Sequence, residues 1–247
     1  MSPGLRIKIL QTPIDALTME ETLEIIDRAI VDRRLVRHAC VNAAVLVAML
    51  KDPQLQKSVV SCDIINADGK SVVWASWFLG KPLPERVAGP DLMHEVVKLA
   101  FHKGYRIFLL GAREEVVNKV ASEYSSRFSD KIIAGYHHGY FGQDDEEDIV
   151  NQIAASQAQI LFVAMTSPKK ELFLEKYEKQ LNVPFIMGVG GSFDIVAGII
   201  KRAPMWMQKS GLEWLYRLLQ EPRRMWKRYL VTNSLFIYYV LREKYAF

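Results

Sequence analysis

The chain has 247 residues, and half of them are hydrophobic, which fits a globular protein of one large domain or of one domain with an appendage. Its two cysteines, Cys40 and Cys62, are too few for a disulfide scaffold and favour a reducing compartment. The sequence has neither a secretory leader pattern nor an apolar run of about 18 residues that would span a membrane. We therefore expect a protein that is kept in the cytosol.

The formal net charge of +4 is distributed unevenly along the chain. Residues 201–247 contain ten Lys and Arg but only three Glu, so this segment carries +7 and the first 200 residues carry −3. A basic tail on a mildly acidic body predicts an anionic partner for the tail. Nucleic acid, phospholipid and a diphosphate substrate all satisfy this requirement.

In chain order, a capping box at Thr18–Glu21 predicts a first helix, because apolar residues at helical spacing follow it. Short apolar runs then alternate with amphipathic helical segments. The strand-like runs are 37–43, 61–69, 105–111, 131–136, 159–165 and 184–193. This alternation predicts an α/β fold with a Rossmann-like parallel sheet and helices on both faces.

The tail has a different pattern from the body. Tryptophans alternate with Arg and Lys after Pro204, and the apolar segment 229–241 has only thirteen residues, too few to cross a bilayer of about 30 Å. We expect an α/β core over residues 1–200, and a basic amphipathic helical appendage over 201–247. Such a helix suits the membrane interface.

Several polar or glycine residues fall where the predicted strands end. Ligands of open parallel sheets bind beyond the carboxyl ends of the strands, which places Asn42, Asp68, Gly111 and the loop 188–191 at one crevice. Asp68 is there suited to act as a general base. The pair Asp68-Gly69 is equally typical of a turn that begins a helix, and the local pattern alone favours the turn.

Phosphate-binding candidates are individually weak. The sequence GVGGSFD (188–194), which includes Gly190 and Asp194, allows close approach of backbone N–H groups to an anion, but it is also a simple strand-to-helix turn. Arg86, in a Pro-rich loop, and the tail residues Arg217, Arg223 and Arg224 suit a phosphate or diphosphate. A membrane-docked basic helix explains the tail arginines as well.

Other chemistries find little support. His137 and His138 lack partners at a metal-ligand spacing, and neither cysteine has a recognisable catalytic setting. The basic residues are confined to the tail and no nucleic-acid motif accompanies them, so we expect no nucleic-acid partner. Two alternatives stay open: a nucleotide-binding oxidoreductase of Rossmann type, although GxGxxG is missing, and a non-enzymatic membrane-surface module.

Taken together, the ordered stretches resemble the WecG/TagA/CpsF family of bacterial glycosyltransferases. They cover nearly the whole chain and are NADG (66–69), ERVAGPDL (85–92), FLLG (108–111), GYF (139–141), SPKKE (167–171), GVGGSFD (188–194), KRAP (201–204) and GLEWLYRLLQEPRR (211–224). The resemblance implies an inverting, metal-independent and cofactor-free transfer of a sugar from a UDP-sugar to a polyprenyl-diphosphate-linked sugar. It also implies peripheral attachment at the inner face of the cell membrane. A homo-oligomer stays open.

The resemblance also implies roles for individual residues. Asp68 would be the catalytic base, with Arg217 and Arg224 stabilising the departing UDP from a membrane-facing lid. The other residues implied to bind substrate are Asn42, Arg86 and Asp194. With this ordered set of motifs, the base becomes the preferred interpretation of Asp68.

The chain departs from the family pattern at two positions. Cys40 stands where the family often has Thr, and Lys170 stands where it often has Gln. Both changes could alter which donor sugar is bound, and Lys170 could pair with a uronic acid carboxylate or with a phosphate. The hexose or N-acetylhexosamine that is transferred is therefore left open.

Overall fold

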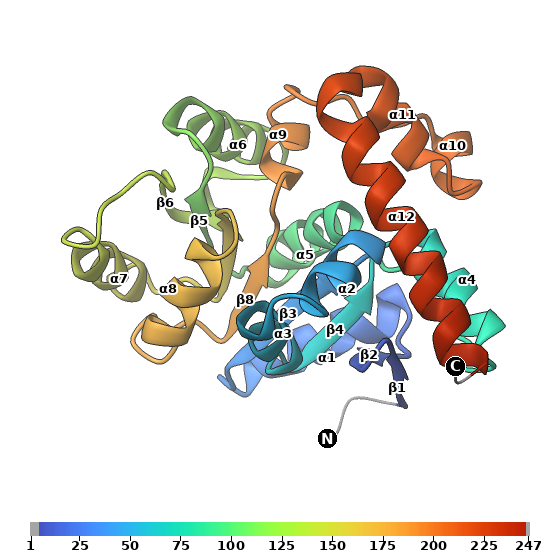
Figure 1. Cartoon of the computed structure of the whole chain (residues 1–247). Coiled ribbons are helices and arrows are strands. Elements are labelled where there is room, and N and C mark those ends of the chain that lie inside the picture. The colour runs from blue at the N-terminus through green and yellow to red at the C-terminus, as the bar shows by residue number, and fades with distance from the viewer. Residues whose placement is uncertain (1–4, 246–247) are drawn as a thin grey trace.

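A six-stranded parallel sheet forms the centre of the computed structural model, which describes residues 5–245 except the side chains of Arg224, Lys227 and Arg228. The strand order is β4-β3-β8-β7-β5-β6, and every neighbouring pair is parallel. The predicted α/β fold is thus confirmed (Figure 1). The strands are β3 (Val36–Val41), β4 (Ile64–Ala67), β5 (Ile107–Gly111), β6 (Ile133–His137), β7 (Ile160–Ala164) and β8 (Phe185–Gly188).

Helices cover both faces of this sheet, because alternate residues of each central strand point to opposite sides. One core cluster joins the sheet to α1 (Met19–Val31), α5 (Gly89–Lys103), α6 (Glu114–Arg127) and α9 (Ser192–Val196). Two further clusters form on the other face. They involve α2 (Ala43–Met49), α3 (Pro53–Val60), α4 (Lys70–Phe78), α7 (Glu146–Ala155) and α8 (Lys169–Tyr177), and a 3₁₀ turn at Asp130–Ile132 precedes β6.

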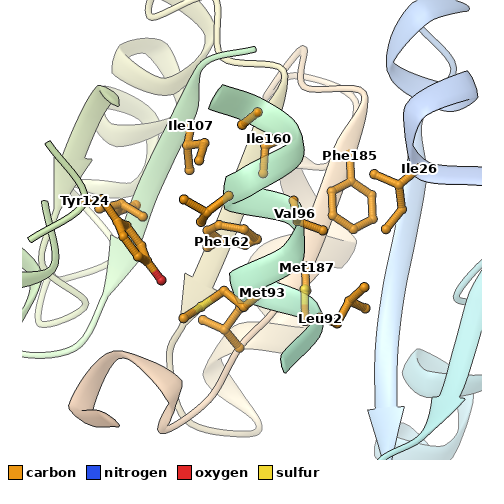
Figure 2. Packing of buried hydrophobic residues seen from close by; sticks show 14 of the residues in the cluster. Ile26, Leu92, Met93, Val96, Ile107, Tyr124, Ile160, Phe162, Phe185 and Met187 are labelled. Carbon is orange, nitrogen blue, oxygen red and sulfur yellow. The ribbon is translucent and has the colours of Figure 1, made fainter. Parts of the chain in front are cut away.

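The packing under α5 shows this alternation directly (Figure 2). Phe162 of β7 is buried in the cluster beneath α5, where Met93 and Val96 are buried with it. The next residue, Val163, is buried in the opposite cluster with α7 and α8. Strands buried on both faces read as continuous apolar runs, which is why the sequence pattern locates them well.

The first helix, α1, begins as its capping box predicts. Thr18 is the N-cap and its side chain accepts the Glu21 N–H, while the Glu21 carboxylate accepts the Thr18 N–H at 2.8 Å. Both bonds satisfy backbone donors that have no partner within the helix. The expected start of the helix is confirmed.

A β-hairpin precedes α1 that the sequence pattern does not reveal. Strands β1 (Arg6–Ile9) and β2 (Thr12–Asp15) are antiparallel, and both turn residues, Leu10 and Gln11, have positive φ of 48° and 64°. Such turns normally carry Asn or Gly, so the usual hairpin signal is missing. The Asp15 carboxylate secures the hairpin, since it accepts Nε of Arg6 at 2.7 Å and the Ile65 N–H of β4 at 2.7 Å.

The tail forms three helices, α10 (Met205–Lys209), α11 (Glu213–Gln220) and α12 (Pro222–Tyr245). The long helix α12 crosses α2, and its Phe236 and Val240 are buried with residues of α2 and α4 (Figure 1). Within residues 5–245, no helix is both long and apolar enough to cross a bilayer. The division of the chain at residue 200 stays a prediction.

We expect the substitution Asp15→Ala to lower the free energy of unfolding by about 2–4 kcal/mol, because Asp15 is only 2% exposed and its loss leaves the Ile65 N–H without its acceptor and Arg6 without its carboxylate partner. Urea unfolding checks this, with a lower midpoint and an unchanged slope. Glu24→Ala, at an exposed helical ion pair, is the control and changes stability by less than about 0.5 kcal/mol. An Asp15→Ala protein as stable as the control would contradict the assignment.

Candidate active site

A cavity of about 630 Å³ opens beyond the carboxyl ends of β3 and β4, between α4 and the tail helices. It collects four of the predicted site residues: Asn42, Asp68, Arg86 and Arg217. Its cationic lining residues are Lys70, Arg86, Lys201, Arg202 and Arg217, and its carboxylates are Asp68 and Glu213. A surplus of cations in a concave site suits an anionic ligand such as a diphosphate.

Asp68 directly follows β4 and is held by its own backbone and side chain. Its N–H donates to the Val41 carbonyl of β3 at 2.9 Å, and its Oδ1 accepts the Gly89 N–H at the start of α5 at 3.2 Å. Burial raises the pKa of Asp68, and the charges of Glu213 and Asp91 add to the rise, whereas Arg86 and the Gly89 N–H oppose it. A fixed carboxyl with a raised pKa is suited to general base catalysis.

The backbone after β4 forms a turn that begins a helix, as the local pattern predicts, but the carboxylate of Asp68 does not cap that helix. Gly69, not Asp68, is the N-cap of α4, and no side chain caps this helix. Asn42 is instead a true N-cap, since its side-chain oxygen accepts the Val45 N–H of α2 at 3.1 Å. The carboxylate of Asp68 thus faces the cavity without a capping role in α4.

Arg86 is locked in place by a carboxylate from the tail. Its side chain is 10% exposed, and Nη2 donates to Oε2 of Glu213, the first residue of α11, at 2.9 Å. Asp91 of α5 lies 3.9 Å from the same nitrogen. Within the described residues, Arg86 therefore forms its ion pairs with Glu213 and Asp91, while its charge is close enough to Asp68 to affect the pKa of that carboxyl.

A second arginine completes a ring of four charges. Arg202 binds Asp91 through both terminal nitrogens, with Nη2 to Oδ2 at 2.7 Å, and its Nε lies 3.6 Å from Oε1 of Glu213. We call Arg86, Asp91, Arg202 and Glu213 the charge ring. It connects the loop before α5 and α5 itself to the segments before and within α11. Three of its members, Asp91, Arg202 and Glu213, are not among the residues that the sequence singles out.

Arg217 lies one turn after Glu213 on α11 and lies near the glycine loop that follows β8. A Cβ built on Gly191 would be 3.7 Å from Nη2 of Arg217 and 3.7 Å from Oδ2 of Asp194. The Nε of Arg217 is buried and has no hydrogen-bond partner among the described residues. The predicted lid arginine and the predicted Asp194 thus converge on the loop 190–191, with one donor of Arg217 available for a ligand.

Cys40 and Lys170 line a separate, smaller cavity of about 280 Å³. Lys170 Nζ lies 3.1 Å from Oε1 of the buried Glu171, which also accepts the Ser167 hydroxyl at 2.8 Å. Burial raises the pKa of the Cys40 thiol well above its ordinary value, and the nearby charge of Asp68 adds to the rise. Ala44 lines both cavities, so the two are neighbours across the start of α2.

The remaining predicted residues line neither cavity among the described residues. Gly111 has φ of +124°, and a Cβ there would meet the Ala164 backbone at 2.5 Å, so close packing of β5 and β7 explains this glycine. Gly190 turns the chain after β8 with φ of +49°. Arg223 is exposed at the start of α12, and the side chain of Arg224 lies outside the described part. Their binding roles stay predictions.

No group of three or more His, Cys, Asp or Glu side chains among the described residues is arranged to hold a metal ion. The positive charge of the cavity comes from arginine and lysine side chains, which are suitable partners for phosphate oxygens.

The sequence is similar to a known protein family over nearly its whole length. The model of the glycosyl transferase WecG/TagA/CpsF family matches residues 7–247. The chain belongs to this family and is a glycosyltransferase. Membership decides against the oxidoreductase and against the non-enzymatic module.

Proteins of two bacteria are similar to most of the chain. A protein of Bacillus subtilis (strain 168) is 38% identical over 190 residues, 77% of this chain and 73% of the relative. A protein of Staphylococcus aureus (strain MW2) is 38% identical over 180 residues, 73% of this chain and 69% of the relative. Both are named N-acetylglucosaminyldiphosphoundecaprenol N-acetyl-beta-D-mannosaminyltransferase.

We expect Glu213→Ala to loosen the attachment of α11 to the core, because Arg86 and Arg202 would then share Asp91 alone. Loss of one partner of a largely buried ion pair costs on the order of 3 kcal/mol. Native-state hydrogen exchange checks this: amides of α11 should exchange about 100-fold faster, while those of β7 keep their protection. The control is Lys209→Ala, at an exposed position of α10. Equal protection of α11 in both variants would contradict the role given to the charge ring.

Proposed function

We propose that this protein transfers a hexose or N-acetylhexosamine from a UDP-sugar to a polyprenyl-diphosphate-linked sugar, with inversion at the anomeric carbon and without a metal. The observation that carries the proposal is the single cavity in which Asp68 faces a surplus of cations. The relatives, which by name act on an N-acetylglucosaminyl-diphosphoundecaprenol, support the class of acceptor.

In the proposed reaction Asp68 is the general base. Its carboxylate takes the proton from the acceptor hydroxyl as the oxygen of that hydroxyl attacks the anomeric carbon of the donor. The bond between this carbon and the diphosphate oxygen breaks, and UDP leaves with the electron pair. Attack from the face opposite to the leaving group inverts the configuration.

The cations of the cavity stabilise the leaving group. The diphosphate gains negative charge as the bond breaks, and preorganised cations lower the free energy of such a transition state. Arg217 is suited to this role, since its Nε is buried and has no protein partner among the described residues. Arg86 has further donors besides the nitrogen that binds Glu213, and Asn42 lines the same cavity. Arg224 is proposed as a second lid arginine from the resemblance alone.

Donor selection is proposed for the smaller cavity. Cys40 and Lys170 lie there, and Lys170 is paired with Glu171. A donor that carries a carboxylate would have to compete with Glu171 for Lys170, whereas a neutral sugar would leave that pair intact. The sugar that the relatives transfer, N-acetylmannosamine, is one member of the panel tested below.

Peripheral attachment to the inner membrane face is proposed for the tail. Trp206 and Trp226 are 64% and 55% exposed, and exposed Arg and Lys accompany them. Tryptophan prefers the membrane interface, and basic residues add attraction to anionic lipids. The acceptor is a membrane lipid, so this location brings the enzyme to its substrate.

The first measurement of function is UDP release in EDTA, with a polyprenyl-diphosphate-GlcNAc analogue and a panel of UDP-sugars. The panel is ManNAc, ManNAc uronate, glucose, glucuronate, galactose and GlcNAc. We expect one donor to give acceptor-dependent release, with release in EDTA within about twofold of that in Mg²⁺, because cationic side chains take the place of a metal. Activity that disappears in EDTA would contradict metal independence. A protein that binds no UDP would contradict the proposal as a whole.

We expect Asp68→Asn to lower kcat by about 10²–10⁴ while it leaves the affinity for UDP within about twofold, because the change removes proton transfer and little else. The wild-type rate should fall as pH falls through the pKa of Asp68, which burial raises above the usual value. Stopped assays from pH 4 to 9 and calorimetric UDP titration measure both effects. Asn42→Ala is a useful comparison, since it alters the same cavity without removing the base. Most activity retained in Asp68→Asn would eliminate Asp68 as the base.

A further inference from the structure

The large cavity has two ends of different chemistry. The charged residues that line it come from the segments 68–86 and 201–217. Beyond these, the described lining residues of α4 and α12 carry no charge at all, and include Trp74, Phe78, Phe236, Ile237 and Leu241. The cavity is therefore an apolar groove that begins at the charged site around Asp68.

One wall of this groove is a stripe along α12. The lining residues of this helix recur at helical spacing and are Met225, Tyr229, Asn233, Phe236, Ile237, Val240 and Leu241. At 1.5 Å rise per residue, the stripe from 225 to 241 is about 24 Å long. The groove is thus long and narrow, and far longer than a sugar diphosphate requires.

The facing wall is α4, which starts directly after Asp68. Trp74, Ala75 and Phe78 point from it into the cavity, and Trp74 contacts the turn before α11, where a Cβ on Gly211 would lie 2.9 Å from Cη2 of Trp74. Phe236 and Val240 are buried, while Trp74 and Ile237 are 53% and 59% exposed. The groove therefore has a closed apolar floor and an open edge.

We propose that this groove holds the first isoprene units of the acceptor's polyprenyl chain. The inference rests on the proposed function and names a binding site for the part of the acceptor that takes no part in the chemistry. The acceptor is linear, with the sugar hydroxyl at one end, then the diphosphate, then the apolar chain. The cavity offers a charged end around Asp68 for the polar head of the acceptor, and the apolar walls of α4 and α12 for its chain.

Binding the chain in this way has a consequence for the transfer step. Apolar contacts in the groove hold the lipid at its diphosphate end, so they supply binding energy remote from the reacting hydroxyl. The bound chain also fixes the direction in which the sugar points from the cations toward Asp68. Chain length should then change KM until the groove is filled, and little beyond that length.

The test compares two neighbouring exposed residues of α12. Ile237 lines the groove, whereas Tyr238, 51% exposed, is not among its lining residues. Full-length enzyme carrying Ile237→Asp, Tyr238→Asp or Ile237→Leu is assayed without detergent. The acceptors are soluble GlcNAc-diphosphate analogues with one to five isoprene units. Circular dichroism and UDP binding confirm that each variant is folded.

For wild type and Tyr238→Asp we expect KM to fall as isoprene units are added. Ile237→Asp should raise KM for the longest analogue by about tenfold, because the bound chain loses one aliphatic contact. KM for the shortest analogue should change by less than about twofold. Ile237→Leu should restore the wild-type series. No dependence on chain length, or equal effects of the two Asp variants, would overturn the groove as a lipid site. Absence of transfer to every analogue, with UDP still bound, would instead contradict the proposed acceptor class.

Discussion

The charge ring of Arg86, Asp91, Arg202 and Glu213 is the interaction on which the arrangement of the candidate site depends. Its members come from segments more than 100 residues apart: Arg86 bonds Glu213 at 2.9 Å, and Arg202 bonds Asp91 with two nitrogens. Glu213 is the first residue of α11, so fixing it also fixes the side of α11 that carries Arg217. The placement of Arg217, the proposed leaving-group cation, is thus a consequence of an ion pair one turn earlier.

The ring also determines the electrostatics around Asp68. An arginine next to a carboxylate normally pairs with it and lowers its pKa, which would weaken a base. Here the carboxylates of Glu213 and Asp91 engage Arg86, and both charges raise the pKa of Asp68 in addition to the effect of burial. Arg86 still lowers the pKa of Asp68 by its charge, but its ion pairs are with Glu213 and Asp91, and Asp68, the proposed base, keeps a raised pKa. The cost is partial neutralisation of Arg86, and Lys70, Lys201 and Arg217 supply the remaining positive charge.

The strands and the first helix are predicted well because the patterns that identify them each lie within a few consecutive residues. Parallel strands buried on both faces give continuous apolar runs, and the capping box of α1 lies within four residues. The same locality places Asp68 and Asn42 at strand ends. The hairpin β1–β2 escapes prediction because Leu10 and Gln11 occupy a positive-φ turn without Asn or Gly.

The charge ring escapes prediction for a different reason. No periodicity connects positions 86, 91, 202 and 213, and each residue alone resembles an ordinary surface charge. Only the fold brings them together. Gly111 has two explanations, since its position at a strand end suggests ligand binding while its close approach to the Ala164 backbone gives a packing reason for a glycine. Both ligand binding at a strand end and close packing of two strands favour a glycine, so the sequence alone does not distinguish them.

Gly89, the first residue of α5, lies next to one residue of each cavity, Cys40 and Asp68. Cys40 lines the smaller cavity, and a Cβ on Gly89 would lie 3.5 Å from its Sγ, which is van der Waals contact. The N–H of the same Gly89 donates to Oδ1 of Asp68. A group that enters the smaller cavity and displaces Cys40 would thus shift the backbone donor of the proposed base. Gly89 thus lies between Cys40, proposed to select the donor sugar, and Asp68, the proposed base, so we expect a change at position 40 to affect turnover as well as specificity.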